Sequence, residues 1–182
     1  PLSASWTVTG SGAFALGLNQ KCRAHITGMT PGRIVDYGLK DSMNMGACMA
    51  PAAADTVARH MEDFHVTPEE YDRIITGDLG SVGQTVLIDL LREKGIDIAD
   101  RHMDCGIEIF DAEAQDTHAG GSGCGCSAVT LAAYVLPKLE SGEWKKVLFL
   151  PTGALLSKTS FNEGKSVPGI AHAVVLESPA VK

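Results

Sequence analysis

The sequence predicts an α/β fold in which helices pack on a mostly parallel or mixed sheet. Short apolar runs of strand length alternate along the chain with longer apolar stripes whose members are three or four residues apart, which is the helical period. Two of the short runs, residues 146–150 and 170–176, are apolar enough to form central strands that are buried on both faces. Strands and helices that alternate in this way build layered α/β domains.

Two segments near the start of the chain are expected to contribute strands. Residues 6–18 are predicted to be a strand that is interrupted by the sequence Gly10-Ser11-Gly12. Residues 22–37 are predicted to form two short strands on either side of Thr30-Pro31-Gly32, because Pro and Gly together indicate a turn.

The first long helix is predicted from an apolar stripe at helical spacing, formed by Ala53, Val57, His60, Met61 and Phe64. Pro51 is expected in its first turn, where a missing N–H group does no harm. Because His60 lies on the apolar stripe, we expect it to be a hydrogen-bonded core residue. Thr67-Pro68-Glu69-Glu70 is a capping box, which predicts a short helix that begins there.

The remaining elements follow from the same two periodicities. Residues 73–76 are predicted to be a strand with residues 77–80 as its exit loop, and residues 82–91 are predicted to be a helix. Residues 106–110 resemble a weak strand. A third helix follows a glycine-rich segment, and its apolar stripe runs through residues 128–139.

Composition excludes several classes of protein. The 15 basic and 22 acidic residues among 182 give a net charge of −7, which argues against nucleic acid or an anionic membrane as a bulk electrostatic partner. No apolar run approaches the ~20 residues that span a bilayer, and no signal-peptide pattern opens the sequence. The five cysteines are an odd number, which favours a reducing, intracellular setting. The opening Pro1, without Met, suggests a fragment or a processed product.

The most informative local feature is the glycine-rich segment Gly120-Gly-Ser-Gly-Cys-Gly-Cys-Ser127. Backbone N–H groups at the start of a helix can converge on an anion, while a tight joint that only needs small residues is an equally good interpretation. A Walker loop is excluded because no Lys follows the glycines. Gly123-x-Gly125-x-x-Ala128 matches a dinucleotide-binding pattern, but no apolar strand directly precedes it.

Cys124 and Cys126 allow three interpretations. The first is a metal site with Cys105, His102 or His118, although Cys-x-Cys is not a usual zinc spacing. The second is a nucleophile whose thiol is acidified by the helix N-terminus. The third, which we favour, is that these are small, buried and unreactive thiols.

Residues 43–51 carry three Met and one Cys just before the first long helix. Flexible thioethers suit an adaptable apolar pocket and also fill irregular cores, and core filling is the favoured interpretation. His172, in the last predicted strand, is expected to have a structural role.

Five motifs together resemble the stage V sporulation protein AD family: Gly120–Ser127, Ala50–Thr56, Thr76–Leu79, Pro151–Ser157 and Pro168–Glu177. That family is similar to thiolases and ketoacyl-ACP synthases, which consist of two similar βαβαβαββ halves. The resemblance implies a thiolase-like fold. Residues 1–18 would be the last strand of the N-terminal half and residues 19–182 the C-terminal half, with helices packed on a mixed sheet.

The resemblance also implies that catalytic residues are missing. A ketoacyl synthase takes its Cys nucleophile from the first half, and a His and an Asn from the second half. Here Thr76-Gly77-Asp78-Leu79 stands where the His is expected, and Gly121-Ser122-Gly123 stands near the place of the Asn. Because both oxyanion-stabilising groups are expected to be absent, we predict no catalytic residue and no enzymatic activity.

The function that the resemblance implies is the binding of dipicolinic acid, alone or as its calcium chelate, for uptake into the developing spore. The expected partners are membrane proteins of the same sporulation channel complex, the N-terminal half and, in the complete protein, a second copy in a homodimer. No nucleic acid, resident cofactor or metal is expected. The expected location is peripheral, on the cytoplasmic side of the spore or forespore inner membrane, where the complex also serves germination.

The ligand site implied by the resemblance combines an apolar slot with convergent donors, as a flat aromatic dianion requires. Asp78 would repel the anion or hold its Ca²⁺. The other predicted contacts are backbone or side-chain donors and apolar walls, namely Gly121, Ser122, Gly123, Cys124, Met45, Cys48 and Leu155. Leu in place of Gly121 or Gly123 is expected to abolish binding more than it disturbs folding.

The sequence is also compatible with two other functions. One is an active thiolase-type or ketoacyl synthase-type acyltransferase whose Cys lies in the N-terminal half. The other is a purely structural adaptor of the membrane complex. Turnover of acyl-CoA would favour the first, and a failure to bind dipicolinate would favour the second.

Overall fold

The computed structural model describes residues 2–18 and 21–179. Its centre is a five-stranded sheet whose strands lie in the order β2-β9-β6-β3-β4. Strand β3 is parallel to β4 and β6, whereas β9 is antiparallel to β6 and β2. The strands are β2 (His25–Thr30), β3 (Arg73–Thr76), β4 (His102–Asp104), β6 (Lys146–Leu150) and β9 (Ala173–Glu177). Residues 19–20, at the predicted boundary between the two halves, lie outside the described residues, as does Pro1.

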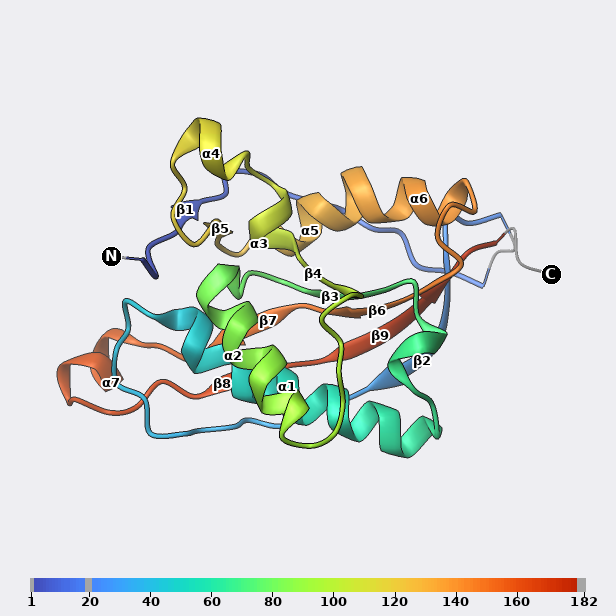
Figure 1. Cartoon of the computed structure of the whole chain (residues 1–182). Helices are drawn as coiled ribbons and strands as arrows, with labels where there is room; N and C mark the ends of the chain where they lie inside the picture. Colours follow the sequence, from blue (N-terminus) through green and yellow to red (C-terminus); the bar gives the residue numbers. More distant parts are fainter. Residues whose placement is uncertain (1, 19–20, 180–182) are drawn as a thin grey trace.

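Helices cover both faces of this sheet (Figure 1). The helices α1 (Met45–Phe64) and α2 (Gly80–Arg92) lie on one face. The other face is covered by α5 (Cys126–Thr130), η2 (Leu131–Val135) and α6 (Leu136–Glu140), which follow one another without a break. The main elements therefore follow the order βαβαβαββ, and the predicted α/β fold with helices on a mixed sheet is confirmed.

Strand β6 shows why the central strands are apolar throughout. Leu148 and Leu150 belong to the core on the α1–α2 side, and Val147 and Phe149 belong to the core on the α5–α6 side. Successive side chains of a strand point to opposite faces. Because both faces are covered, every position needs an apolar side chain, as predicted for residues 146–150.

Helix α1 begins earlier than expected. The side chain of Asn44 caps it by accepting a hydrogen bond from the backbone N–H of Ala47, so the Met-rich segment is helical. Pro51 therefore lies inside the helix, and its predicted place in the first turn is wrong. A strong N-cap, together with the Ala-rich stretch that follows, outweighs the loss of one N–H donor at Pro51.

His60 on this helix is a buried core residue, as predicted. Its ring nitrogens lie 2.8 Å from Thr30 Oγ1 and 2.6 Å from Tyr71 Oη, and its side chain is fully buried. Burial lowers the pKa of His60 to about 4 and raises the pKa of Tyr71 to about 12. His60 is therefore a neutral link between α1, β2 and the segment before β3.

The capping box at Thr67 and Glu70 forms, but it starts only the 3₁₀ turn η1 (Pro68–Glu70). The chain becomes extended at Tyr71 and enters β3 two residues later, which leaves no room for a longer helix. Helix α2 buries Leu87 and Leu91 as predicted.

Two strand predictions are wrong. Residues 106–110 do not form a strand, because β4 ends at Asp104 and the short helix α3 (Cys105–Glu108) follows, capped by the Asp104 side chain. The long N-terminal strand is reduced to β1 (Trp6–Thr7), which pairs in parallel with β5 (Gly121–Ser122). Its partner ends where the backbone turns at Gly123, with φ of 128°, so residues 8–18 have no strand to pair with there.

Other strand predictions are confirmed in part. Residues 22–37 contain one strand, β2, and then a single bridge between Val35 and Gly169. The apolar run 170–176 is split at His172 into β8 (Gly169–Ala171), which pairs with β7 (Thr152–Ala154), and β9. His172 Nδ1 accepts a hydrogen bond from the backbone N–H of Gly32, which confirms its structural role. The remaining helices are α4 (Ala112–Gln115) and α7 (Lys158–Asn162).

Among the described residues, no helix combines the length and the apolar character that crossing a membrane requires.

Candidate ligand-binding site

Asp78 is the centre of a polar cluster that joins three loops. Its Oδ2 accepts hydrogen bonds from Ser122 Oγ (2.8 Å) and from the backbone N–H of Gly123 (3.0 Å). Its Oδ1 accepts from Thr152 Oγ1 (3.0 Å), and Thr152 Oγ1 in turn accepts from the backbone N–H of Asp78 (3.1 Å). Asp78 and Thr152 follow the parallel strands β3 and β6, whose carboxyl ends meet at one edge of the sheet. That edge is where open α/β sheets bind ligands.

The glycine-rich loop therefore already holds a carboxylate, that of Asp78. The anion-binding interpretation and the tight-joint interpretation each describe a different part of the loop. Ser122 and Gly123 supply the donors. Gly121 is a packed joint, because a Cβ atom there would lie 2.8–2.9 Å from the side chains of its neighbours. Leu at position 121 would thus disrupt folding, contrary to the expectation that it would mainly affect binding.

A second carboxylate, that of Asp104, lies beneath the turn that carries Asp78. Asp104 is 1% exposed. Its Oδ2 accepts from Thr76 Oγ1 (2.6 Å) and the backbone N–H of Leu79 (2.9 Å), and its Oδ1 accepts from the N–H groups of Gly80 (3.1 Å) and Gly106 (3.0 Å). Burial raises the pKa of Asp104, while these hydrogen bonds act in the opposite direction.

His102 extends this network to helix α2. Its Nε2 lies 3.0 Å from Thr76 Oγ1, and its Nδ1 lies 2.9 Å from Gln84 Nε2. Burial lowers the pKa of His102 to about 4, so the ring is neutral at pH 7. Because the Thr76 hydroxyl donates to Asp104, the network assigns the His102 proton to Nε2, which donates to Thr76, while Nδ1 accepts from Gln84.

The cysteines near the cluster are poor nucleophiles. Cys126 is buried, its thiol points at the carbonyl oxygen of Gly77 (3.6 Å), and burial raises its pKa to about 12. Burial also raises the pKa of Cys105. Both thiols stay protonated at neutral pH, so the favoured interpretation is confirmed for Cys126. The expectation that Cys124 is also buried is wrong, because Cys124 is exposed. No group of three or more metal-ligating side chains is arranged for a metal ion within residues 2–18 and 21–179.

The predicted apolar contacts lie at the same end of the molecule. The first turn of α1 touches the Asp78 turn so closely that a Cβ atom at Gly46 would lie 2.1 Å from the carbonyl oxygen of Leu79. Met45 flanks this contact and packs against the core, while Cys48 is buried, so core filling describes both. Leu155 follows β7 and is 41% exposed.

Thr152 and Asp104 are site residues that are not among the predicted contacts. Thr152 lies in the motif Pro151–Ser157, just after the predicted strand at residues 146–150. The strand that is parallel to it, β3, leads to Asp78, so the positions of the two strand ends contain the signal. The predicted strand at residues 106–110 does not place Asp104 at the end of a strand. The true strand ends at Asp104, which places this carboxylate at the carboxyl edge beside Thr76.

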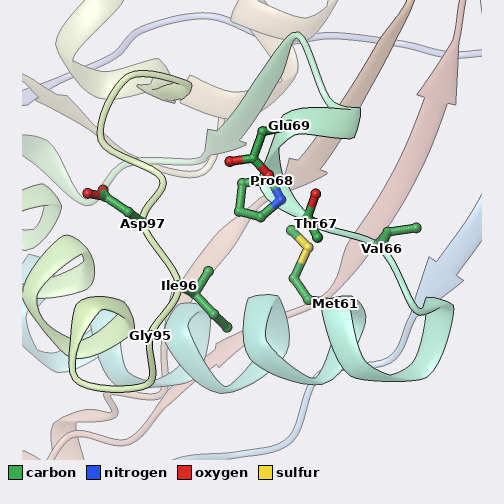
Figure 2. Close-up of a pocket in the computed structure, with 8 residues that line it drawn as sticks. All are labelled: Met61, Val66, Thr67, Pro68, Glu69, Gly95, Ile96 and Asp97. Atoms are coloured by element: carbon green, nitrogen blue, oxygen red, sulfur yellow. The ribbon is translucent and has the colours of Figure 1, made fainter.

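A surface cleft of about 340 Å³ lies at the other end of the sheet (Figure 2). It is formed where α1 ends and where the chain leaves α2, before strands β3 and β4 begin. Met61, Pro68 and Ile96 line it together with Glu69 and Asp97. None of the predicted contact residues belongs to this cleft.

The fold and the cluster define a class: a layered α/β protein with a carboxylate-centred polar site at the carboxyl edge of its parallel strands. Within that class, the chain belongs to the stage V sporulation protein AD family, whose family model matches residues 1–177. Stage V sporulation protein AD of Bacillus subtilis (strain 168) is 42% identical over 177 residues, which are 97% of this chain and 52% of the relative. The chain thus spans about half the length of that curated relative.

Two solved structures overlap the chain more loosely. They are a human mitochondrial 3-ketoacyl-CoA thiolase and a 3-oxoacyl-[acyl-carrier-protein] synthase III from Aquifex aeolicus VF5. Each is 15% identical and matches 86% of this chain. The TM-scores are 0.44 and 0.45, and the matches cover 30% and 46% of those chains, respectively.

Proposed function

We propose that the complete protein, of which this chain spans about half, has a role in sporulation: it binds dipicolinic acid or its calcium chelate for uptake into the developing spore and catalyses no reaction. Membership of the stage V sporulation protein AD family supports the sporulation role. The observation that carries the binding role is the carboxylate of Asp78, which is held by Ser122, Gly123 and Thr152. The donors at this edge of the sheet therefore bind a carboxylate, which is that of Asp78 itself.

The charge of Asp78 bears on the form of the ligand. A free dianion would meet a like charge at the donors that it needs, whereas a calcium chelate would bring a cation to the carboxylate. Among the predicted contacts, Ser122, Gly123 and Cys124 would supply the polar side of the proposed site, whereas Gly121 is a packed joint. On the apolar side of the proposed site, Leu155 is exposed and Met45 is partly buried, whereas Cys48 is buried in the core. The N-terminal half would complete the site.

The same cluster argues against acyl transfer. Asp78 occupies the place that the resemblance assigns to the synthase His, and its oxygens already accept three hydrogen bonds. An oxyanion hole needs donors, and a carboxylate there would repel the developing negative charge. The buried thiols of Cys105 and Cys126 remain protonated at neutral pH.

The assembly is part of the proposal. The complete protein would form a homodimer and dock peripherally on membrane proteins of the same channel complex, on the cytoplasmic side of the spore or forespore inner membrane. No resident cofactor is proposed. Calcium would arrive with the ligand.

Titration calorimetry of the complete protein with dipicolinate, with and without Ca²⁺, tests the binding role. We expect saturable heat, and weaker binding by Ser122→Ala than by Ser81→Ala, which removes an exposed hydroxyl near the site. A lack of heat under both conditions would eliminate ligand binding and leave the structural adaptor. Turnover of an acyl-CoA by the complete protein would contradict the claim that it catalyses no reaction.

A further inference from the structure

The buried carboxylate of Asp104 has no part in the proposed contacts with ligand, yet it is the most fully bonded side chain near the site. Four donors and no acceptor converge on its two oxygens. An ionised carboxylate is acceptor-only and uses such a set fully, whereas a neutral amide would present an N–H₂ group to at least one of these donors. A buried charge is expensive unless it is fully hydrogen-bonded. Packing alone therefore does not explain an Asp at this position.

The donors show what the carboxylate holds. Two of them are the backbone N–H groups of Leu79 and Gly80, the two residues directly after Asp78. The backbone at Gly80 is left-handed, with φ of 64°, and a Cβ atom there would lie 2.5 Å from the carbonyl oxygen of Ala119. The turn is thus pressed between Asp104 on one side and Ala119 on the other. Its direction determines where the Asp78 side chain points.

Thr76 connects this carboxylate to the rest of the sheet. Its hydroxyl donates to Asp104 and accepts from His102, which in turn accepts from Gln84 on helix α2. Each side chain in this series of hydrogen bonds is held and oriented by the next. The series of hydrogen bonds therefore fixes the rotamer of the Asp104 side chain as well as its position.

We infer that Asp104 is a positioning residue that holds the turn at residues 78–80, so that Asp78 bridges Ser122, Gly123 and Thr152 and shapes the ligand site. The effect of Asp104 on ligand affinity rests on the proposed function, whereas its effect on the Asp78 bridge does not. Asp104 accepts no hydrogen bond from Gly123 or Thr152, and its hydrogen-bonded route to both residues passes through the turn that carries Asp78.

Hydrogen exchange of the complete protein tests the bridge directly. In Asp104→Asn we expect faster exchange at the amides of Leu79 and Gly80 and also at Gly123, whose N–H donates to Asp78 and not to Asp104. Asp100→Asn, which alters an exposed carboxylate, is the matched control and should match the wild type. Unchanged exchange at Gly123 in Asp104→Asn would overturn the inference, because the bond between Gly123 and Asp78 would then persist without the Asp104 carboxylate.

A pair of substitutions at Thr76 separates positioning from packing in the affinity for dipicolinate. Thr76→Val keeps the shape and loses the hydroxyl, whereas Thr76→Ser keeps the hydroxyl and loses a methyl group. Positioning predicts that Val weakens binding about tenfold and that Ser largely restores it. A larger loss in Ser than in Val would overturn the inference. If wild-type protein binds no dipicolinate, the proposed function fails, and exchange at Gly123 still decides the role of Asp104.

Discussion

Removing the Asp78 carboxylate should release the glycine-rich loop. Asp78→Ala removes the acceptor of three hydrogen bonds, those from Ser122, Gly123 and Thr152. Asp78→Asn removes the charge but can keep the connections. Its amide oxygen can face Ser122 and Gly123, while its N–H₂ group donates to Thr152 Oγ1, which has a second lone pair available. The two variants therefore separate hydrogen bonding from charge.

The expected magnitude follows from the number of bonds and their burial. A hydrogen bond to a charged group contributes about 1.5–3 kcal/mol when buried. Because Asp78, Ser122 and Gly123 are half-buried and water can replace part of the lost bonding, we take about 1 kcal/mol for each bond. Only two of the three bonds, those from Ser122 and Gly123, hold the glycine-rich loop. Asp78→Ala should then lower the free energy of local opening of this loop by about 2 kcal/mol, which is roughly a 30-fold change in the opening equilibrium. Asp78→Asn should change it by less than about 1 kcal/mol.

Hydrogen exchange measured by mass spectrometry on the complete protein is the assay. The expected result is roughly 30-fold faster exchange at residues 121–125 in Asp78→Ala and near-normal exchange in Asp78→Asn. Asp89→Ala, on the exposed face of α2, serves as the control. Equal acceleration in the Ala and Asn variants would refute the reasoning, since charge and not hydrogen bonding would then hold the loop.

Three further predictions test burial and packing. His60 and His102 have pKa values lowered to about 4, against about 6.5 in the unfolded chain. Below pH 6.5 the unfolded chain therefore takes up protons that the folded chain does not, and the free energy of unfolding should fall between pH 6.5 and 4 by up to about 1.4 kcal/mol per pH unit and histidine. Urea unfolding measures this, and a flat profile would contradict the prediction. Gly121→Ala should lower stability by about 1–3 kcal/mol in the same assay, since its Cβ would lie 2.8–2.9 Å from three side chains; unchanged unfolding would disprove the packed joint. Iodoacetamide should label exposed Cys124 well before buried Cys126. Fragment-ion masses of the labelled peptide would locate the label, and equal labelling would contradict the burial of Cys126.

Elements with a strong local pattern were predictable from the sequence. The strands at residues 73–76 and 146–150, and the helix stripes that bury Leu87 and Leu139, formed as expected. His60 was correctly placed in the core because its position on an apolar helical stripe requires burial. The errors lie where a partner decides the outcome: residues 8–18 have no strand to pair with at β5, and Pro51 is carried inside a helix whose start is set by Asn44.

The candidate site divides in the same way. The motif around Asp78 and the glycine-rich loop were recognisable as polar, turn-forming segments of the sequence. That the loop donates to Asp78, that Thr152 completes the bridge and that Asp104 supports the turn were decided only by tertiary structure. These hydrogen bonds join residues 24 to 74 positions apart, and the sequence around a side chain does not indicate a partner so distant. The alternation of apolar residues selects the layers, whereas the parallel pairing of β3 with β4 and β6 brings these polar groups to one edge.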